Sequence, residues 1–127
     1  MIQFILVGVG SLVGGALHYG LSTWVHRVLD NPWFPYGTLA VNVSGCFVIG
    51  FFAGLAETRV AFTSEARLFL FVGILGGFTT FSSFALETFS LTRDTQNVAA
   101  LVNIGSQLLL GLLAVWIGNV LAHAIGG

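Results

Sequence analysis

The sequence is poor in charge. Its 127 residues include no lysine, four arginines and five acidic residues, so that 7% are charged, against about 25% in soluble domains. Hydrophobic residues make up 56% of the chain. A soluble domain of this length must cover itself with polar side chains, and this chain has too few to do so. The composition therefore excludes a soluble domain, and the net charge of −1 argues against nucleic acid as a partner.

The chain also has little of what most catalytic sites require. Its single cysteine, Cys46, lies in an apolar run, which excludes an intrachain disulfide and a cysteine-rich metal site. We find no Ser/His/Asp arrangement, no paired carboxylates and no metal-ligand spacing, so we do not expect an enzyme.

What the chain does have is four long uncharged stretches, at 1–26, 31–56, 68–86 and 95–127. About 20 apolar residues cross the hydrocarbon core of a bilayer as a helix, and backbone groups in lipid must pair internally. The stretches predict an all-α integral membrane protein, one domain over 1–127, with transmembrane helices at 2–26, 36–57, 66–91 and 97–123. The first stretch lacks a basic n-region and a cleavage site, so we expect it to be retained.

The four arginines give no preferred orientation. With four spans, Arg59 and Arg67 lie on one side of the membrane, and Arg27 and Arg93 lie on the other. Two interpretations are open: four arginines are too few to orient the chain, or the chain inserts both ways round. In the second case, copies of opposite orientation pair about an axis in the membrane plane.

Glycine is abundant inside the expected helices, with 17 residues in all. Small residues let helices in lipid approach closely, within one chain or between chains. Four helices enclose little more than a narrow seam, so a transport site needs a second copy, and we expect a homodimer.

Polar residues interrupt the third expected helix in the segment GGFTTFSSF, residues 76–84. This segment is a poor continuous helix, and we expect a break near its middle, which releases backbone carbonyls that suit a small cation such as Na⁺. A kinked packing helix is the alternative. Phe81 and Phe84 share one face; they either pack against lipid or protein, or turn their electropositive ring edges towards an anion.

Amides and hydroxyls occupy one face of two other expected helices. Thr38 and Asn42 lie together on the second, and Asn103, Ser106 and Gln107 lie together on the fourth. They either form interhelical hydrogen bonds or line a route for a small anion, which exchanges its water for donors without being trapped by strong charge.

Two segments carry a resemblance to a known family. GTLAVNVSG at 37–45 and GGFTTFSSFALE at 76–87 resemble the signature segments of the FluC (CrcB) fluoride-specific ion channels, and the length and four-helix layout are similar too. The resemblance implies passive export of fluoride from the cytoplasm across the cell (inner) membrane. It also implies an antiparallel, dual-topology homodimer with two pores and a structural Na⁺ at the dimer centre.

The same resemblance implies roles for single residues. It makes the backbone carbonyls of Gly76 and Thr79 the Na⁺ ligands. It also makes Phe81 and Phe84 the aromatic box of the pore and Asn42 the pore-lining amide. The remaining residues expected along the fluoride pore are Thr38, Ser82, Ser106 and Glu87. Much of the family has an arginine in the first helix where this chain has His18; this histidine either makes anion entry sensitive to pH or is a neutral, hydrogen-bonded helix residue, and we favour the second interpretation.

Two other functions compete. A proton-coupled small multidrug transporter is also tiny and four-spanning, but it needs a membrane-embedded carboxylate, and the first expected helix has none. The other alternative is a non-transporting assembly subunit. Such a subunit needs no helix faces lined with Thr, Ser and Asn, so the presence of these faces argues against it.

Overall fold

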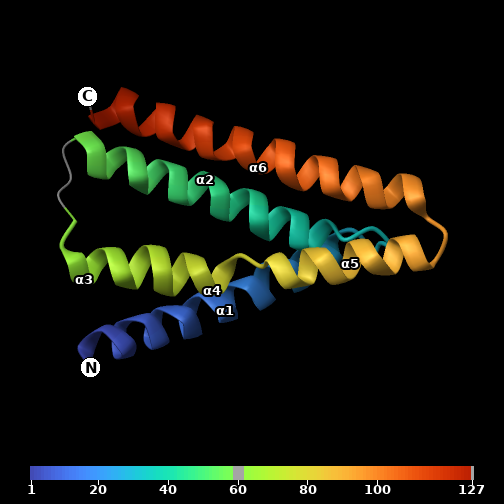
Figure 1. The fold of residues 1–127 in the computed structure, drawn as a ribbon, viewed down its shortest axis with the longest axis horizontal. Helices are drawn as coiled ribbons and strands as arrows, with labels where there is room; N and C mark the ends of the chain where they lie inside the picture. The colour runs from blue at the N-terminus through green and yellow to red at the C-terminus, as the bar shows by residue number, and fades with distance from the viewer. Residues whose placement is uncertain (59–61, 127) are drawn as a thin grey trace.

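A computed structural model describes residues 1–58 and 62–126, and these residues form helices without any strand (Figure 1). Within them, four helical spans are long and apolar enough to cross a membrane: Ile2–Val28, Tyr36–Thr58, Ser64–Arg93 and Asn97–Gly126. The predicted all-α architecture with four spans is confirmed, and each span ends one to three residues beyond its expected end.

The spans divide into seven helical elements. These are α1 (Ile2–Val28), α2 (Tyr36–Thr58), α3 (Ser64–Arg67), the π-helix η1 (Leu68–Leu75), α4 (Gly76–Phe78), α5 (Phe81–Arg93) and α6 (Asn97–Gly126), counted over the described residues. The third span thus contains a π-helical stretch followed by two extended residues, Thr79 and Thr80. Its first turn is capped by Thr63, whose hydroxyl accepts a hydrogen bond from the Ala66 N–H at 3.1 Å.

The helices pack as two pairs, and the pairs contact each other through α1 and α2. α6 lies along α2, and α1 lies against η1 and α4, while both ends of the chain are at the same end of the bundle (Figure 1). Glycine sets the distance in both pairs. A Cβ on Gly14 of α1 would collide with the Ile74 carbonyl oxygen, and a Cβ on Gly118 of α6 would collide with the Phe47 carbonyl oxygen. Close backbone approach of this kind is how helices associate in lipid.

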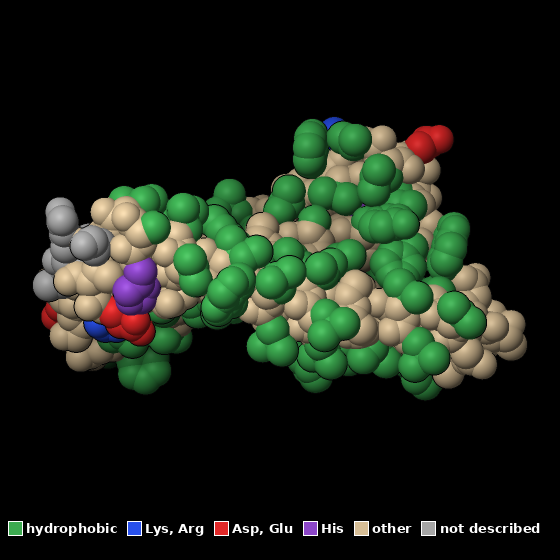
Figure 2. Space-filling model, turned by 90° about the horizontal axis from the view of Figure 1, so that it is seen from above, with side chains coloured by type: hydrophobic (Ala, Val, Ile, Leu, Met, Phe, Trp, Pro, Cys, Tyr) green, Lys and Arg blue, Asp and Glu red, His purple; other side chains and the backbone are tan. Residues whose placement is uncertain are grey.

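The outer surface is apolar, as a lipid environment requires. Leu109 and Leu112 of α6 are each 71% exposed. Hydrophobic side chains cover much of the face shown in Figure 2; histidine, acidic and basic side chains lie together at its left end, and further acidic and basic side chains lie at its upper right.

The charged side chains follow the expected alternation. Arg27 and Arg93 lie in the last turns of α1 and α5, which end on the same side of the bundle. Arg67 ends α3 on the opposite side, with the chain termini. Arg59, the fourth arginine of the count, lies outside the described residues. Insertion in both orientations stays a prediction.

Candidate functional site: an interrupted helix beside an aromatic cavity

The centre of the site is the interruption of the third span. Thr79 (φ −82°, ψ 159°) and Thr80 (φ −148°, ψ 117°) are extended, so the helix stops at Phe78 and begins again at Phe81. The Thr80 hydroxyl accepts a hydrogen bond from the Ser83 N–H at 3.1 Å. This is the normal role of threonine as an N-cap, and it starts α5 as a new helix inside the span.

Two carbonyl groups lose their helical partners here. The Thr80 N–H, which in a continuous helix would bond the Gly76 carbonyl, donates instead to Asn42 Oδ1 at 2.8 Å. The Ser83 N–H, which would bond the Thr79 carbonyl, goes to the Thr80 hydroxyl. The two carbonyls are hard oxygen donors, the ligand type that small cations such as Na⁺ favour.

Asn42 of α2 connects the interruption to two other helices. Its Oδ1 accepts from the Thr80 N–H, while its Nδ2 donates to the Thr80 carbonyl and to Gln107 Oε1 of α6, both at 3.0 Å. Of the two interpretations given for Asn42, the interhelical hydrogen bonds are therefore present, and they use both hydrogens of its amide group.

His18 of α1 holds the same region from the other side. Its Nδ1 lies 2.8 Å from the Phe78 carbonyl oxygen. Because a carbonyl oxygen only accepts, Nδ1 carries the proton and donates. The interruption is therefore bonded to α1 through His18 and to α2 through Asn42.

A cavity of about 410 Å³ opens beside the interruption. The rings of Phe81 and Phe84 border it with centroids 5.6 Å apart and planes tilted by 59°. Phe81 is 79% exposed. Asn42, Thr79 and Gly76 also line this cavity, so five of the expected site residues come together.

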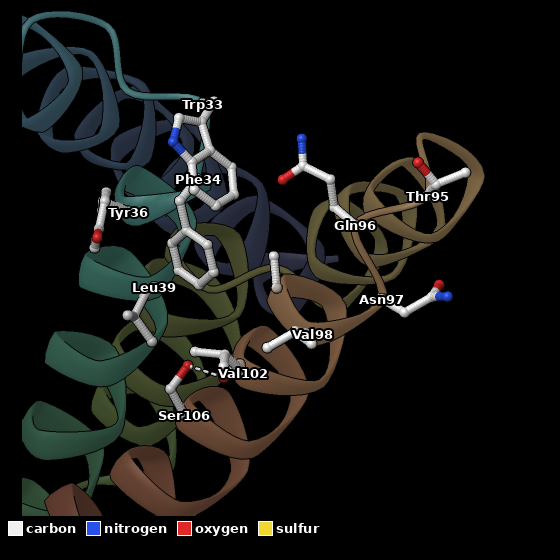
Figure 3. Close-up of a pocket in the computed structure, with 11 residues that line it drawn as sticks. Trp33, Phe34, Tyr36, Leu39, Thr95, Gln96, Asn97, Val98, Val102 and Ser106 are labelled. Atoms are coloured by element: carbon white, nitrogen blue, oxygen red, sulfur yellow. Dashed lines mark hydrogen bonds between the residues drawn. The ribbon is translucent and has the colours of Figure 1, made fainter.

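The other expected residues lie elsewhere. Thr38 is buried in α2, and Glu87 lies on α5 with a buried Oε1 that no described group bonds. The exposed Ser82 hydroxyl lies 3.4 Å from that of Thr80. Ser106 lines a different cavity, of about 780 Å³, beside aromatic side chains such as Phe34. Figure 3 shows its hydroxyl bonded to its own helix, at 2.6 Å from the Val102 carbonyl oxygen.

Sequence reasoning missed two features of this site. His18 was interpreted as a hydrogen-bonded helix residue, and the hydrogen bond is present, but the spacing gave no signal that its partner would be the Phe78 carbonyl. Gln107 was placed on a polar face, but nothing along the chain indicated that it would meet Asn42 from another helix.

Four apolar spans, one of them interrupted beside a cavity bordered by aromatic rings, define a small multi-pass membrane protein. A family model described as "CrcB-like protein, Camphor Resistance (CrcB)" matches residues 5–119, and the chain belongs to this family. The localisation that follows is a membrane one, in bacteria the cell membrane.

Curated relatives match over almost the whole chain. A fluoride-specific ion channel FluC of Parabacteroides distasonis is 46% identical, covering 98% of this chain and 96% of its own. That of Rhizobium etli is 45% identical over 98% and 99%, and that of Paramagnetospirillum magneticum is 46% identical over 98% of both chains. These relatives are ion channels and not enzymes, in agreement with the prediction.

Proposed function

We propose that this protein is a fluoride-specific ion channel that lets fluoride leave the cytoplasm passively. The observation that carries the proposal is the cavity at the interrupted helix, which is lined by Phe81, Phe84 and uncharged polar groups. Kinship with the FluC channels supports the choice of ion. The alternative of a proton-coupled multidrug transporter is not favoured, because the relatives are channels.

Uncharged hydrogen-bond donors and aromatic ring edges suit a small anion that binds briefly and is then released along a pore. The electropositive edges of aromatic rings attract an anion weakly, and conduction requires binding that is favourable but not tight. We assign Phe81 and Phe84 to the fluoride pathway on this basis. Asn42, Thr38, Ser82, Ser106 and Glu87 complete the proposed lining.

The functional unit in this proposal is an antiparallel homodimer with two pores. A single copy leaves the Phe81 ring largely exposed and its cavity open on one side. A second copy, related by a two-fold axis in the membrane plane, would present the same surface in return. The balanced arginines support insertion in both orientations.

The same two-fold axis would bring together the carbonyls of Gly76 and Thr79 from both copies. Their helical N–H partners are diverted, and a cage of neutral oxygens suits a monovalent cation, since divalent ions usually recruit carboxylates. When bound, Na⁺ would supply a fixed positive charge that holds the two copies together. We propose it as a structural ion that is not conducted.

Fluoride efflux from liposomes that contain only this chain tests the function. Purified protein should release fluoride, measured with a fluoride electrode, when a potassium ionophore dissipates the membrane potential, and it should do so without a proton gradient. Chloride should pass far more slowly. Equal chloride and fluoride fluxes, or a requirement for a proton gradient, would refute the proposal.

A further inference from the structure

Gln107 presents an unused hydrogen-bond donor inside the molecule. It lies on α6, is 9% exposed and lines the 410 Å³ cavity together with Asn42, Phe81 and Phe84. Its Nε2 is buried, and no described group accepts a hydrogen bond from it. Buried polar atoms in proteins are nearly always paired, so an unpaired one at a cavity wall indicates a missing partner.

The orientation of this amide group follows from a backbone donor. The Thr80 N–H can only donate, so the atom of Asn42 that faces it is Oδ1. The Asn42 Nδ2 must then face Gln107. Because Nδ2 donates, the Gln107 atom that accepts the hydrogen bond is Oε1. This leaves the two hydrogens of Gln107 Nε2 for another partner. Reversing the Gln107 amide would set two NH₂ groups against each other.

The chemistry of the free atom selects the kind of partner. Three buried side-chain atoms of the described residues lack a hydrogen bond: Glu87 Oε1, Asn103 Oδ1 and Gln107 Nε2. The Asn103 Oδ1 only accepts, because the Asn103 Nδ2 donates to a Thr88 hydroxyl that itself donates to the Phe84 carbonyl. Glu87 and Asn103 do not line the 410 Å³ cavity, so Gln107 Nε2 is the one of the three atoms that belongs to a cavity-lining residue and can donate to an anion there.

We infer that Gln107 Nε2 donates directly to the fluoride ion at the wall of the Phe81 and Phe84 cavity, and that Asn42 is a positioning residue. Both hydrogens of the Asn42 amide are already used by the Thr80 carbonyl and by Gln107. Asn42 therefore acts through Gln107, by bonding its Oε1 and so leaving its Nε2 free to donate. This inference rests on the proposed function and adds a specificity-determining residue to it.

Flux measurements on Gln107→Glu test the donor. The substitution keeps an oxygen for the Asn42 Nδ2 but replaces the NH₂ group with a carboxylate oxygen. Hydrogen bonds to charged groups are the stronger ones, so we expect fluoride flux to fall roughly tenfold or more. Gln96→Glu makes the same change at an exposed position beside α6 and should leave the flux near that of the wild type.

The outcomes separate this inference from the proposed function. A wild type that passes no fluoride refutes the channel itself. A conducting wild type together with a folded Gln107→Glu variant of equal flux leaves the channel standing and overturns the role of Gln107.

Side-chain amide NMR on the wild type decides the matter even if the variant fails to fold. The chain has three glutamines, Gln3, Gln96 and Gln107, so ¹⁵N-glutamine labelling gives three NH₂ groups, two of them exposed controls. Titration with fluoride should shift the Gln107 signals alone, and the same concentration of chloride should not. Gln107 signals that do not respond, or that respond equally to chloride, would overturn the inference.

Discussion

Replacing Asn42 with aspartate tests how the interrupted helix is held. The side chain keeps its size, and one oxygen can still accept from the Thr80 N–H. The second oxygen, however, faces the Thr80 carbonyl and Gln107 Oε1, which the amide reaches at 3.0 Å each. Two donor bonds are lost, and like-signed oxygens take their place.

The size of the effect follows from these two bonds. Side-chain hydrogen bonds between membrane helices contribute about 0.6 kcal/mol on average and up to about 1.7 kcal/mol. The two bonds together are worth about 1.2 to 3.4 kcal/mol on that basis. If they hold the conducting geometry, fluoride flux should fall by roughly tenfold to a few hundredfold, since 1.36 kcal/mol is a factor of ten in rate. Gln107 can turn its amide to meet the carboxylate, but its NH₂ group is then no longer free to donate elsewhere.

The assay is fluoride efflux from liposomes, with Asn97→Asp as the matched control. Asn97 is exposed at the start of α6, where a negative charge suits the helix N-terminus. Size-exclusion chromatography and thermal melting in detergent establish that each variant is folded. A folded Asn42→Asp protein with undiminished flux would refute the reasoning.

Four further predictions concern other parts of the molecule. Phe81→Leu and Phe84→Leu should each lower fluoride flux while changing the melting temperature little, because leucine lacks the electropositive ring edge; unchanged flux in both would make the rings ordinary packing. Gly14→Ala should destabilise the fold by about 1–3 kcal/mol in a detergent unfolding titration because its Cβ meets backbone, whereas a Cβ at the neighbouring Gly15 meets nothing within 4 Å, so Gly15→Ala should be neutral. Replacing Na⁺ with a large organic cation should weaken the dimer in a dissociation assay, and dimer stability indifferent to Na⁺ would count against the structural ion. Two or three lysines added at the C-terminus, or instead in the 92–96 loop, should bias insertion in opposite directions; each form alone should lose flux and co-expression should restore it, and a single orientation of the wild-type termini, mapped by labelling, would contradict dual topology.

The spans were predictable because lipid imposes a simple rule on the sequence. Apart from Glu87, the charged residues lie near the ends of the spans or between them, and the thickness of the hydrocarbon core fixes how far apart these positions are. The helix ends were less certain. The third span begins at Ser64, two residues before its expected start at 66, and Thr63 caps it.

The bonding within the site could not be predicted in the same way. The spacing placed Asn42 and Gln107 on polar faces of two helices, but the rotation of each helix about its axis decides whether those faces meet. That rotation is set by packing, such as the close approach at Gly118. The π-helix at Leu68–Leu75 has no signature in its apolar sequence either. Ser106 and Gln107 are neighbours along α6, yet they line different cavities. The sequence alone did not indicate this separation.

The bonds around the interruption have a consequence for how the protein is made. His18 and Asn42, which bond the backbone on either side of Thr79, belong to the first two spans, and the chain is synthesised from its N-terminus. The interrupted backbone of the third span is thus synthesised after His18 and Asn42, the two side chains that bond to it. Gln107 arrives only with the last span, so the hydrogen bond between Asn42 and Gln107 is the final one of this set to become possible during biogenesis.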